Sequence, residues 1–179
     1  MGLLQRLLNN EKGVTSVEVA FATPMLAILA LSCVEVTSFI LFQQKLDRAT
    51  TAMGDLTAQA RGLTNDDLAN LYDAAEYIMR PFDLDNEGSV IVSSISTDDD
   101  ENPRVNWQWN SSDSASQFGV ANGAASLPEG FVVRDGESIV VSEVYAMYTP
   151  IVMGRFFDTN TFYQYSIFRP RFDALTSLD

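Results

Sequence analysis

The chain has 179 residues, with 11 Lys and Arg against 24 Asp and Glu, a net charge of −13 and no histidine. This length suits one domain with an anchor, and the acidic balance argues against nucleic acid and against anionic lipid headgroups as partners. The absence of histidine removes the commonest general base and zinc ligand, so we expect neither enzymatic activity nor a metal or other cofactor. The single cysteine, Cys33, excludes an intramolecular disulfide.

The apolar segment 14–42 is the strongest feature of the chain. It carries only two charges, Glu18 and Glu35, which are separated by 16 uncharged residues. As a helix it measures about 43 Å, more than the ~30 Å hydrocarbon core of a bilayer. A secretory signal has an apolar region of roughly 7–15 residues and then a small-residue cleavage site, which this segment lacks. We therefore predict a retained transmembrane helix over 14–42.

The start of this segment resembles a type IV prepilin processing site. Gly13 is followed by Val14, Glu18 comes five residues after the glycine, and the string EKGVTSVEVAFATPMLAIL runs into an apolar helix interrupted by Pro24. This string is similar to the start of TadE-like proteins, the minor pilins (pseudopilins) of the tight-adherence (Tad) type IV pilus. It departs from the pilin pattern at Val19, where an aromatic residue is usual.

The resemblance implies a prepilin leader over 1–13, which a prepilin peptidase removes after Gly13, so that Val14 becomes the first residue. It also implies that Glu18 meets the free amino terminus of a neighbouring subunit, and such pairing offsets the desolvation of a buried carboxylate. A simpler interpretation is that Glu18 and Glu35 only mark opposite membrane faces, since about 26 Å of helix separates them.

The resemblance also implies a location and partners. It places the chain in the inner membrane as a single-pass protein, with a cytoplasmic N-terminus and a periplasmic C-terminal domain. Lys and Arg are nearly balanced on the two sides of the helix, so the charge bias does not decide the orientation. The implied partners are membrane lipid, the prepilin peptidase, other pilin or minor pilin subunits and the pilus assembly machinery.

Residues 43–179 form the predicted globular domain. Apolar residues at helical spacing over 43–62 predict that the membrane helix continues into it, although Gly54 lowers helix propensity. Thr64 is the predicted N-cap of a second amphipathic helix that ends before Pro81.

Strands are expected in the rest of the domain. The residue types over 89–96, 105–110, 138–148 and 162–168 predict four strands, Phe131–Val133 suggests the start of a short one, and 111–128 reads as a mobile loop. Alternation places Val105, Trp107 and Trp109 on one face. The predicted fold class is α+β: a long N-terminal transmembrane helix that continues into a small domain with one antiparallel sheet, as in pilins.

Two strings near the C-terminus extend the resemblance. EVYAMYTP, at 143–150, is similar to a strand end of TadE- and TadG-like proteins, and FRPR, at 168–171, is similar to their terminal aromatic-Arg-Pro-Arg element. Residues 64–130 show no such similarity. Within these strings, we expect Glu143 to form a structural ion pair with Arg169 or Arg171.

Two acidic segments are candidates for calcium binding. Residues 83–88 begin like an EF-hand loop, but the twelfth position is Ser94 instead of glutamate, so we predict a turn. The run 98–101 is best interpreted as a solvated loop tip, with weak calcium binding as the alternative.

Two hypotheses follow. The chain is either a minor pilin that acts in the assembly or structure of a Tad-type adhesion pilus, or an unprocessed, membrane-tethered periplasmic binding or envelope module.

Overall fold

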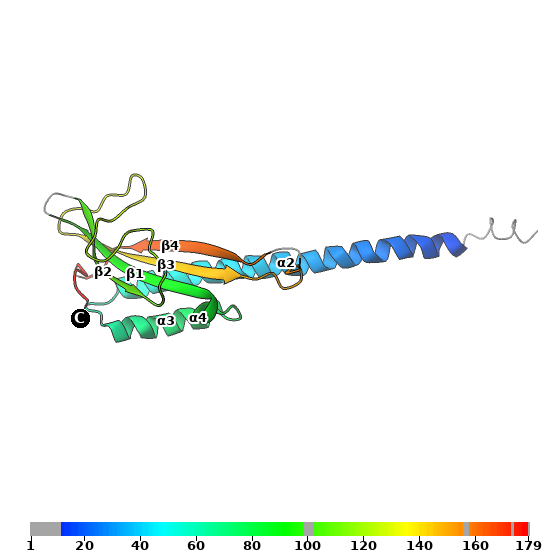
Figure 1. Ribbon diagram of the computed structural model, residues 1–179, viewed down its shortest axis with the longest axis horizontal. Helices are drawn as coiled ribbons and strands as arrows, with labels where there is room; N and C mark the ends of the chain where they lie inside the picture. Colours follow the sequence, from blue (N-terminus) through cyan, green and yellow to red (C-terminus); the bar gives the residue numbers. More distant parts are fainter. Residues whose placement is uncertain (1–11, 99–101, 156–157, 173, 179) are drawn as a thin grey trace, which may run out of the picture. The chain divides into compact units, whose positions relative to one another are not determined.

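The computed structural model describes residues 12–98, 102–155, 158–172 and 174–178. These residues divide into two compact units. One, here called the helix unit, comprises the chain up to Ile40 together with Pro150–Asp158; the other, the sheet unit, comprises Leu41–Thr149 and Thr159–Asp179. The long helix α2 (Lys12–Ala58) contributes to both units (Figure 1).

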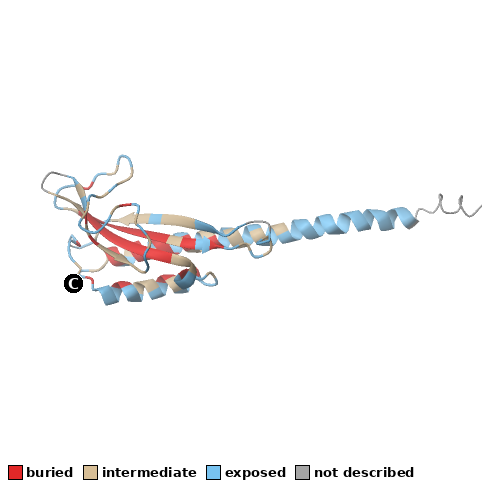
Figure 2. Cartoon of the chain, viewed as in Figure 1, coloured by how far each residue is buried: buried red, intermediate tan, exposed pale blue. Residues whose placement is uncertain are grey.

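In the helix unit, α2 is apolar and exposed. Its large side chains between Val14 and Ile40 are accessible, and Figure 2 shows this half of the helix as exposed. Hydroxyl groups of Thr23, Ser32 and Thr37 donate hydrogen bonds to carbonyl oxygens four residues earlier, at 2.7, 2.9 and 2.8 Å. These hydroxyls are therefore satisfied within the helix, as a lipid environment requires.

Within the described part of the chain, α2 is the one helix whose length and mean hydropathy (2.2) suffice to cross a membrane. A single apolar helix near the N-terminus suits one membrane anchor or a signal sequence. Neither its length nor its hydropathy shows an orientation.

The sheet unit is built on four antiparallel strands in the order β2-β1-β3-β4. The strands are β1 (Gly88–Thr97), β2 (Pro103–Asn110), β3 (Ser138–Tyr148) and β4 (Asn160–Phe168). All four predicted strands are confirmed. The short strand suggested at Phe131–Val133 is wrong. This segment is irregular and follows a turn that is closed by the Phe131 amide, which donates to the Pro128 carbonyl oxygen at 3.0 Å, and Val133 packs into a core cluster.

One face of the sheet packs against the second half of α2, as Figure 1 shows. Phe42 is fully buried, and its ring lies 5.1 Å from Phe82, 5.1 Å from Tyr148 and 5.6 Å from Phe162. Buried residues Leu46, Ala49 and Met53 follow at helical spacing. Because these side chains recur every three or four residues, they form one stripe that faces the sheet. The sequence predicts this stripe, but Leu56, which the same spacing includes, is 44% exposed, and α2 ends at Ala58 instead of continuing to 62.

The shorter helices α3 (Asn65–Met79) and α4 (Leu84–Glu87) precede β1. Thr64 caps α3 through a capping box with Asp67, so the predicted N-cap is confirmed, and α3 ends before Pro81 as expected. The ring of Tyr72 on α3 lies 6.1 Å from Trp109 of β2. Lys45 on α2 donates to the Ile78 carbonyl oxygen at 2.8 Å, which ties α2 to α3.

The opposite face of the sheet is covered by the irregular segment 111–137. Phe118 and Val133 from this segment join side chains of β1, β2 and β3 in a buried cluster that comprises Ile95, Val105, Phe118, Val133, Ile139 and Val141. Residues 111–128 are irregular, as the predicted loop requires, and the mobility of this loop stays a prediction. The packing of this segment onto the sheet has no clear signal in the sequence, because Phe118, which is buried, lies among many small polar residues.

A bulge separates Val105 from the two tryptophans. Ser94 of β1 pairs with Trp107 while Ile95 pairs with Val105, so the register shifts by one residue. Neighbouring residues of β1 point to opposite faces, and Val105 therefore joins the cluster beneath 111–137 while Trp107 and Trp109 lie on the other face. The prediction that all three share a face is wrong for this reason.

The architecture is α+β, a long apolar helix packed on a four-stranded antiparallel sheet, and is pilin-like.

Candidate functional site

The proposed processing and assembly residues lie in the first turns of α2. Gly13, Val14 and Glu18 are all exposed, and a Cβ placed on Gly13 meets no described atom within 4 Å. The peptide bond between Gly13 and Val14 is thus free of packing within the described chain. Leader residues 1–11 lie outside the described residues.

Glu18 stands on an apolar surface. The neighbouring side chains Val17, Val19 and Phe21 are 55%, 57% and 77% exposed. Among the described residues, no cationic side chain forms an ion pair with Glu18. If this surface enters lipid or a helix bundle, the carboxylate needs a positive partner from another molecule to offset its desolvation.

Glu35, the second charge of the apolar segment, has partners in its own unit. Its carboxylate oxygens accept hydrogen bonds from three consecutive backbone amides, those of Ile151 (3.2 Å), Val152 (2.8 Å) and Met153 (3.1 Å). These amides belong to the turn 151–155 that follows β3. The sequence gives no signal of this contact, because more than 110 residues separate its partners.

Glu143 is fully buried in the middle of β3. It accepts hydrogen bonds from the Ser116 hydroxyl, from the Gln117 amide at 2.9 Å and from the Tyr163 hydroxyl at 2.8 Å. The first two donors belong to segment 111–137 and the third to β4. Glu143 therefore fastens the covering segment to the sheet.

The predicted ion pair of Glu143 with Arg169 or Arg171 is wrong. Glu143 lies opposite Tyr165 on β4, whereas β4 ends at Phe168, which lies opposite Val140. The two arginines come after the C-terminal end of β4 and form other ion pairs. Arg169 contacts Glu137 at 3.1 Å, and Arg171 contacts Asp55 at 2.8 Å.

Tyrosines beside Glu143 have perturbed acidity. Burial raises the pKa of Tyr163 above its usual range, and the hydrogen bond to the Glu143 carboxylate and its charge act in the same direction. Burial also raises the pKa of Tyr145, whose hydroxyl donates to the Ala115 carbonyl oxygen at 3.0 Å. Both hydroxyls therefore keep their protons at neutral pH and act as donors, which suits a structural network.

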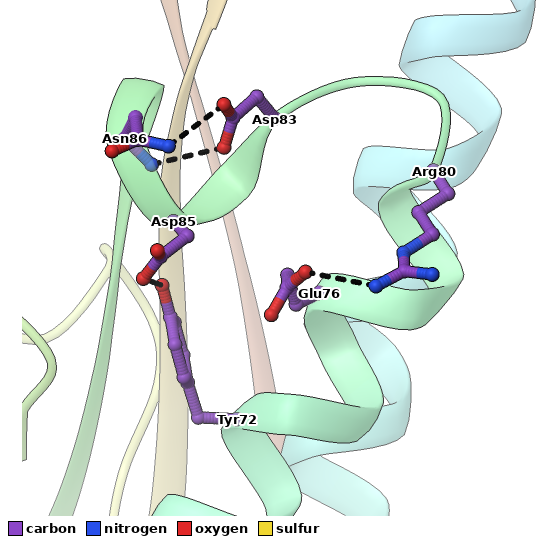
Figure 3. Close-up of polar contacts among 6 residues, drawn as sticks. All are labelled: Tyr72, Glu76, Arg80, Asp83, Asp85 and Asn86. Carbon is purple, nitrogen blue, oxygen red and sulfur yellow. Dashed lines mark hydrogen bonds and ion pairs between the residues drawn. The ribbon is translucent and has the colours of Figure 1, made fainter.

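The acidic segment 83–88 is a helix cap (Figure 3). Asp83 accepts from the backbone amide of Asn86 at 3.0 Å and from its side-chain amide at 2.9 Å, and these hydrogen bonds lower the pKa of Asp83. Tyr72 donates to Asp85 at 3.4 Å, and burial, followed by the charge of Asp85, raises the pKa of Tyr72 to about 12. The predicted turn is confirmed as the one-turn helix α4 and its cap.

The structure describes only Asp98 of the run 98–101; residues 99–101 lie outside the described residues. Among the residues that are described, no group of three or more acidic or cysteine side chains is arranged to hold a metal ion.

Comparison of the chain with protein-family models, with curated proteins and with solved structures finds no match. The features that bear on function are the architecture, the exposed half of α2 and the sequence strings near the two ends of the chain.

Proposed function

We propose that this chain is a TadE-like minor pilin, or pseudopilin: a non-enzymatic subunit that acts in the assembly or structure of a Tad-type adhesion pilus. The observation that carries the proposal is the exposed apolar half of α2, which belongs to a helix whose other half packs on a small antiparallel sheet. Leu26, Ile28 and Leu29, in the middle of the exposed half, are 64%, 63% and 59% exposed. A contiguous apolar surface of this kind needs lipid or other helices around it.

Glu18 gives this helix a role beyond anchoring. Cleavage after Gly13 makes Val14 the new terminus and places Glu18 about one helical turn from the new ammonium group. That group and Glu18 of another copy, or of another pilin subunit, then form a pair of opposite charges within an apolar bundle. The pair offsets the desolvation of both groups and fixes the axial position of one helix against the next.

The segment FRPR at 168–171, which resembles the C-terminal element of the family, makes contacts with the end of α2 and with the sheet that suit this proposal. The backbone amide of Arg171 donates to the carbonyl oxygen of Ala58, the last residue of α2, at 2.9 Å, and its guanidinium contacts Asp55 one turn earlier. An unpaired carbonyl at a helix end is thereby satisfied. Arg169 contacts Glu137 just before β3. The string thus joins the end of α2 to the sheet.

The proposed location is the inner membrane, crossed once, with the leader in the cytoplasm and the sheet unit in the periplasm, followed by incorporation into or priming of a pilus. The proposed partners are membrane lipid, a prepilin peptidase, other pilin or minor pilin subunits and the assembly machinery, and not nucleic acid. The net charge of −13 supports the last point and the solubility of the sheet unit.

The mature N-terminus tests the proposal. The full chain is produced with and without a prepilin peptidase, and its intact mass is measured after extraction from membranes. We expect a chain that begins at Val14 only when the peptidase is present. Gly13→Leu is expected to remain uncut, whereas Val14→Ala, a matched change on the other side of the bond, is expected to be cut. A full-length chain in the presence of active peptidase contradicts processing and favours the unprocessed, membrane-tethered module.

A further inference from the structure

The turn 151–155 is attached to the apolar helix through Glu35. Three consecutive amides point at one carboxylate, those of Ile151, Val152 and Met153, at 3.2, 2.8 and 3.1 Å. Consecutive backbone N–H groups that converge in this way form a concave anion site. Here the anion is supplied by the protein itself, from a helix residue in the same unit.

The contact solves two desolvation problems at once. A carboxylate within an apolar segment is unfavourable in lipid unless it is paired or hydrogen-bonded, and backbone amides of an irregular turn are equally unfavourable there. By accepting hydrogen bonds from three amides, Glu35 stabilises its own negative charge and also gives the amide donors of the turn an acceptor. A turn joined in this way can enter a poorly hydrated region.

The position of Glu35 along the helix corresponds to a membrane boundary. Glu35 lies 17 positions after Glu18, which corresponds to about 26 Å of helix, close to the ~30 Å thickness of the hydrocarbon core. If the first turns of α2 lie at one face of the bilayer, Glu35 and the attached turn reach the opposite face. This is the depth at which a partly apolar turn meets the headgroups.

The exposed side chains of the turn suit that depth. Ile151 is 68% exposed, and Val34 and Val36, which flank Glu35 on the helix, are 52% and 57% exposed. Arg155, at the end of the turn, is exposed and is its only charged residue. An apolar side chain that enters the acyl boundary and a cation that reaches the headgroup phosphates are typical of interfacial segments.

We propose that the turn 151–155 is a membrane-interface element. It lies at the boundary between headgroups and acyl chains, on the side of the bilayer where α2 leaves the membrane, and Glu35 holds it there. Its ligand is the lipid surface itself. The inference rests on the membrane anchor of the proposed function, but not on processing after Gly13 or on pilus assembly. The chain thereby gains a second contact with the bilayer, which limits how far α2 can slide along the membrane normal.

Spin-label depth measurements test the inference on the full chain in phosphatidylcholine vesicles. In a Cys33→Ser background, a nitroxide is attached at Ile151→Cys, at Leu26→Cys in the middle of the exposed helix, or at Val132→Cys in the sheet unit. Val132 is a matched aqueous control, because it is 70% exposed against 68% for Ile151. The measured quantity is the collision rate with oxygen, which concentrates in lipid, divided by that with a water-soluble nickel complex.

We expect the oxygen-to-nickel collision ratio of the label at position 151 to be severalfold higher than that of the label at 132, and lower than that of the label at 26. Adding Glu35→Ala is expected to bring the value at 151 down towards that at 132, because the turn is released, while Glu35→Gln, which keeps an acceptor oxygen, should lie between. An unchanged value at 151 in the Glu35→Ala chain would contradict the role of Glu35.

The remaining outcomes separate this inference from the anchor. A lipid-like value at 26 with a water-like value at 151 overturns the interface element and leaves the anchor intact. A water-like value at 26 overturns both. Shielding of 151 from oxygen and nickel alike, with spin–spin broadening between labels, overturns the inference in favour of a second copy of the chain as the occupant.

Discussion

The two halves of α2 both carry apolar side chains, all around the first half and in one stripe of the second, but they differ in what covers those side chains. From Leu41 to Ala58 the helix contributes a buried stripe to the sheet unit, with Phe42, Leu46 and Met53 at 0–1% exposure. From Gly13 to Ile40 comparable side chains are exposed around the helix. One half is therefore covered by its own chain, and the other depends on an environment outside the chain. This difference teaches that folding of the sheet unit and insertion of the helix are separable properties.

Two glutamates that accept several hydrogen bonds, one in each unit, extend this comparison. Glu143 in the sheet unit is fully buried and is held by two side chains and one amide, whereas Glu35 in the helix unit is held by three backbone amides. Each carboxylate is satisfied within its own unit. Substitutions in one unit are thus expected to leave the property of the other unit unchanged.

The largest expected effect on stability comes from Glu143→Ala. The change leaves the donors Ser116, Gln117 and Tyr163 without their acceptor and opens a cavity between the sheet and segment 111–137. We expect the free energy of unfolding to fall by about 3–5 kcal/mol, because three neutral donors lose their acceptor at about 1–3 kcal/mol each. Urea unfolding of the full chain in detergent micelles, followed by tryptophan fluorescence, measures this change.

Glu137→Ala is the matched control, since Glu137 lies near the same strand but its side chain is 37% exposed. Its loss should cost no more than about 1 kcal/mol. Retention of the Glu143→Ala chain in carbonate-washed membranes should equal that of the native chain. If the Glu143→Ala chain unfolds like the native chain, the stabilising role of Glu143 is wrong. If it loses its membrane retention, the separation of the two units is wrong.

A smaller effect is expected from Gly54→Ala. Alanine favours the helix by about 1 kcal/mol over glycine. A Cβ at position 54, however, lies 2.6 Å from Phe168 Cδ2 and 2.7 Å from Ser166 Oγ of β4. We expect overpacking to dominate and to lower the free energy of unfolding by about 1–2 kcal/mol. The same urea titration measures this change in the free energy of unfolding. A stabilised variant would contradict the prediction and would show that β4 shifts to make room for the added methyl group.

Much of the sheet unit could be predicted from the sequence, because its signals are local. Alternating β-branched and aromatic residues indicate the strands, and Thr64, as an N-cap followed by acidic residues, indicates the start of α3. From the sequence alone, Gly54 is only a weak helix former. Its reason, the close approach of β4 to α2, depends on residues more than 110 positions away.

The errors share one physical cause, which is long-range pairing. The bulge that moves Val105 to the other face depends on the register between β1 and β2. The partners of Glu143 depend on how segment 111–137 folds back over the sheet, and those of Glu35 depend on where the turn 151–155 returns to α2. In the candidate site, Gly13, Val14 and Glu18 follow from a sequence pattern, and their proposed roles remain predictions.

The central claim is that the exposed half of α2 is an assembly element as well as an anchor, and Glu18→Ala tests it most directly. The variant and a Thr23→Ala control, whose lost hydroxyl bonds only within its own helix, are introduced into cells that assemble the pilus, and piliation is counted by electron microscopy. We predict that Glu18→Ala is inserted into the membrane at the native level but strongly reduces piliation, as does Glu18→Gln, while Thr23→Ala is neutral. Normal piliation with Glu18→Ala would contradict the claim and reduce α2 to a membrane tether.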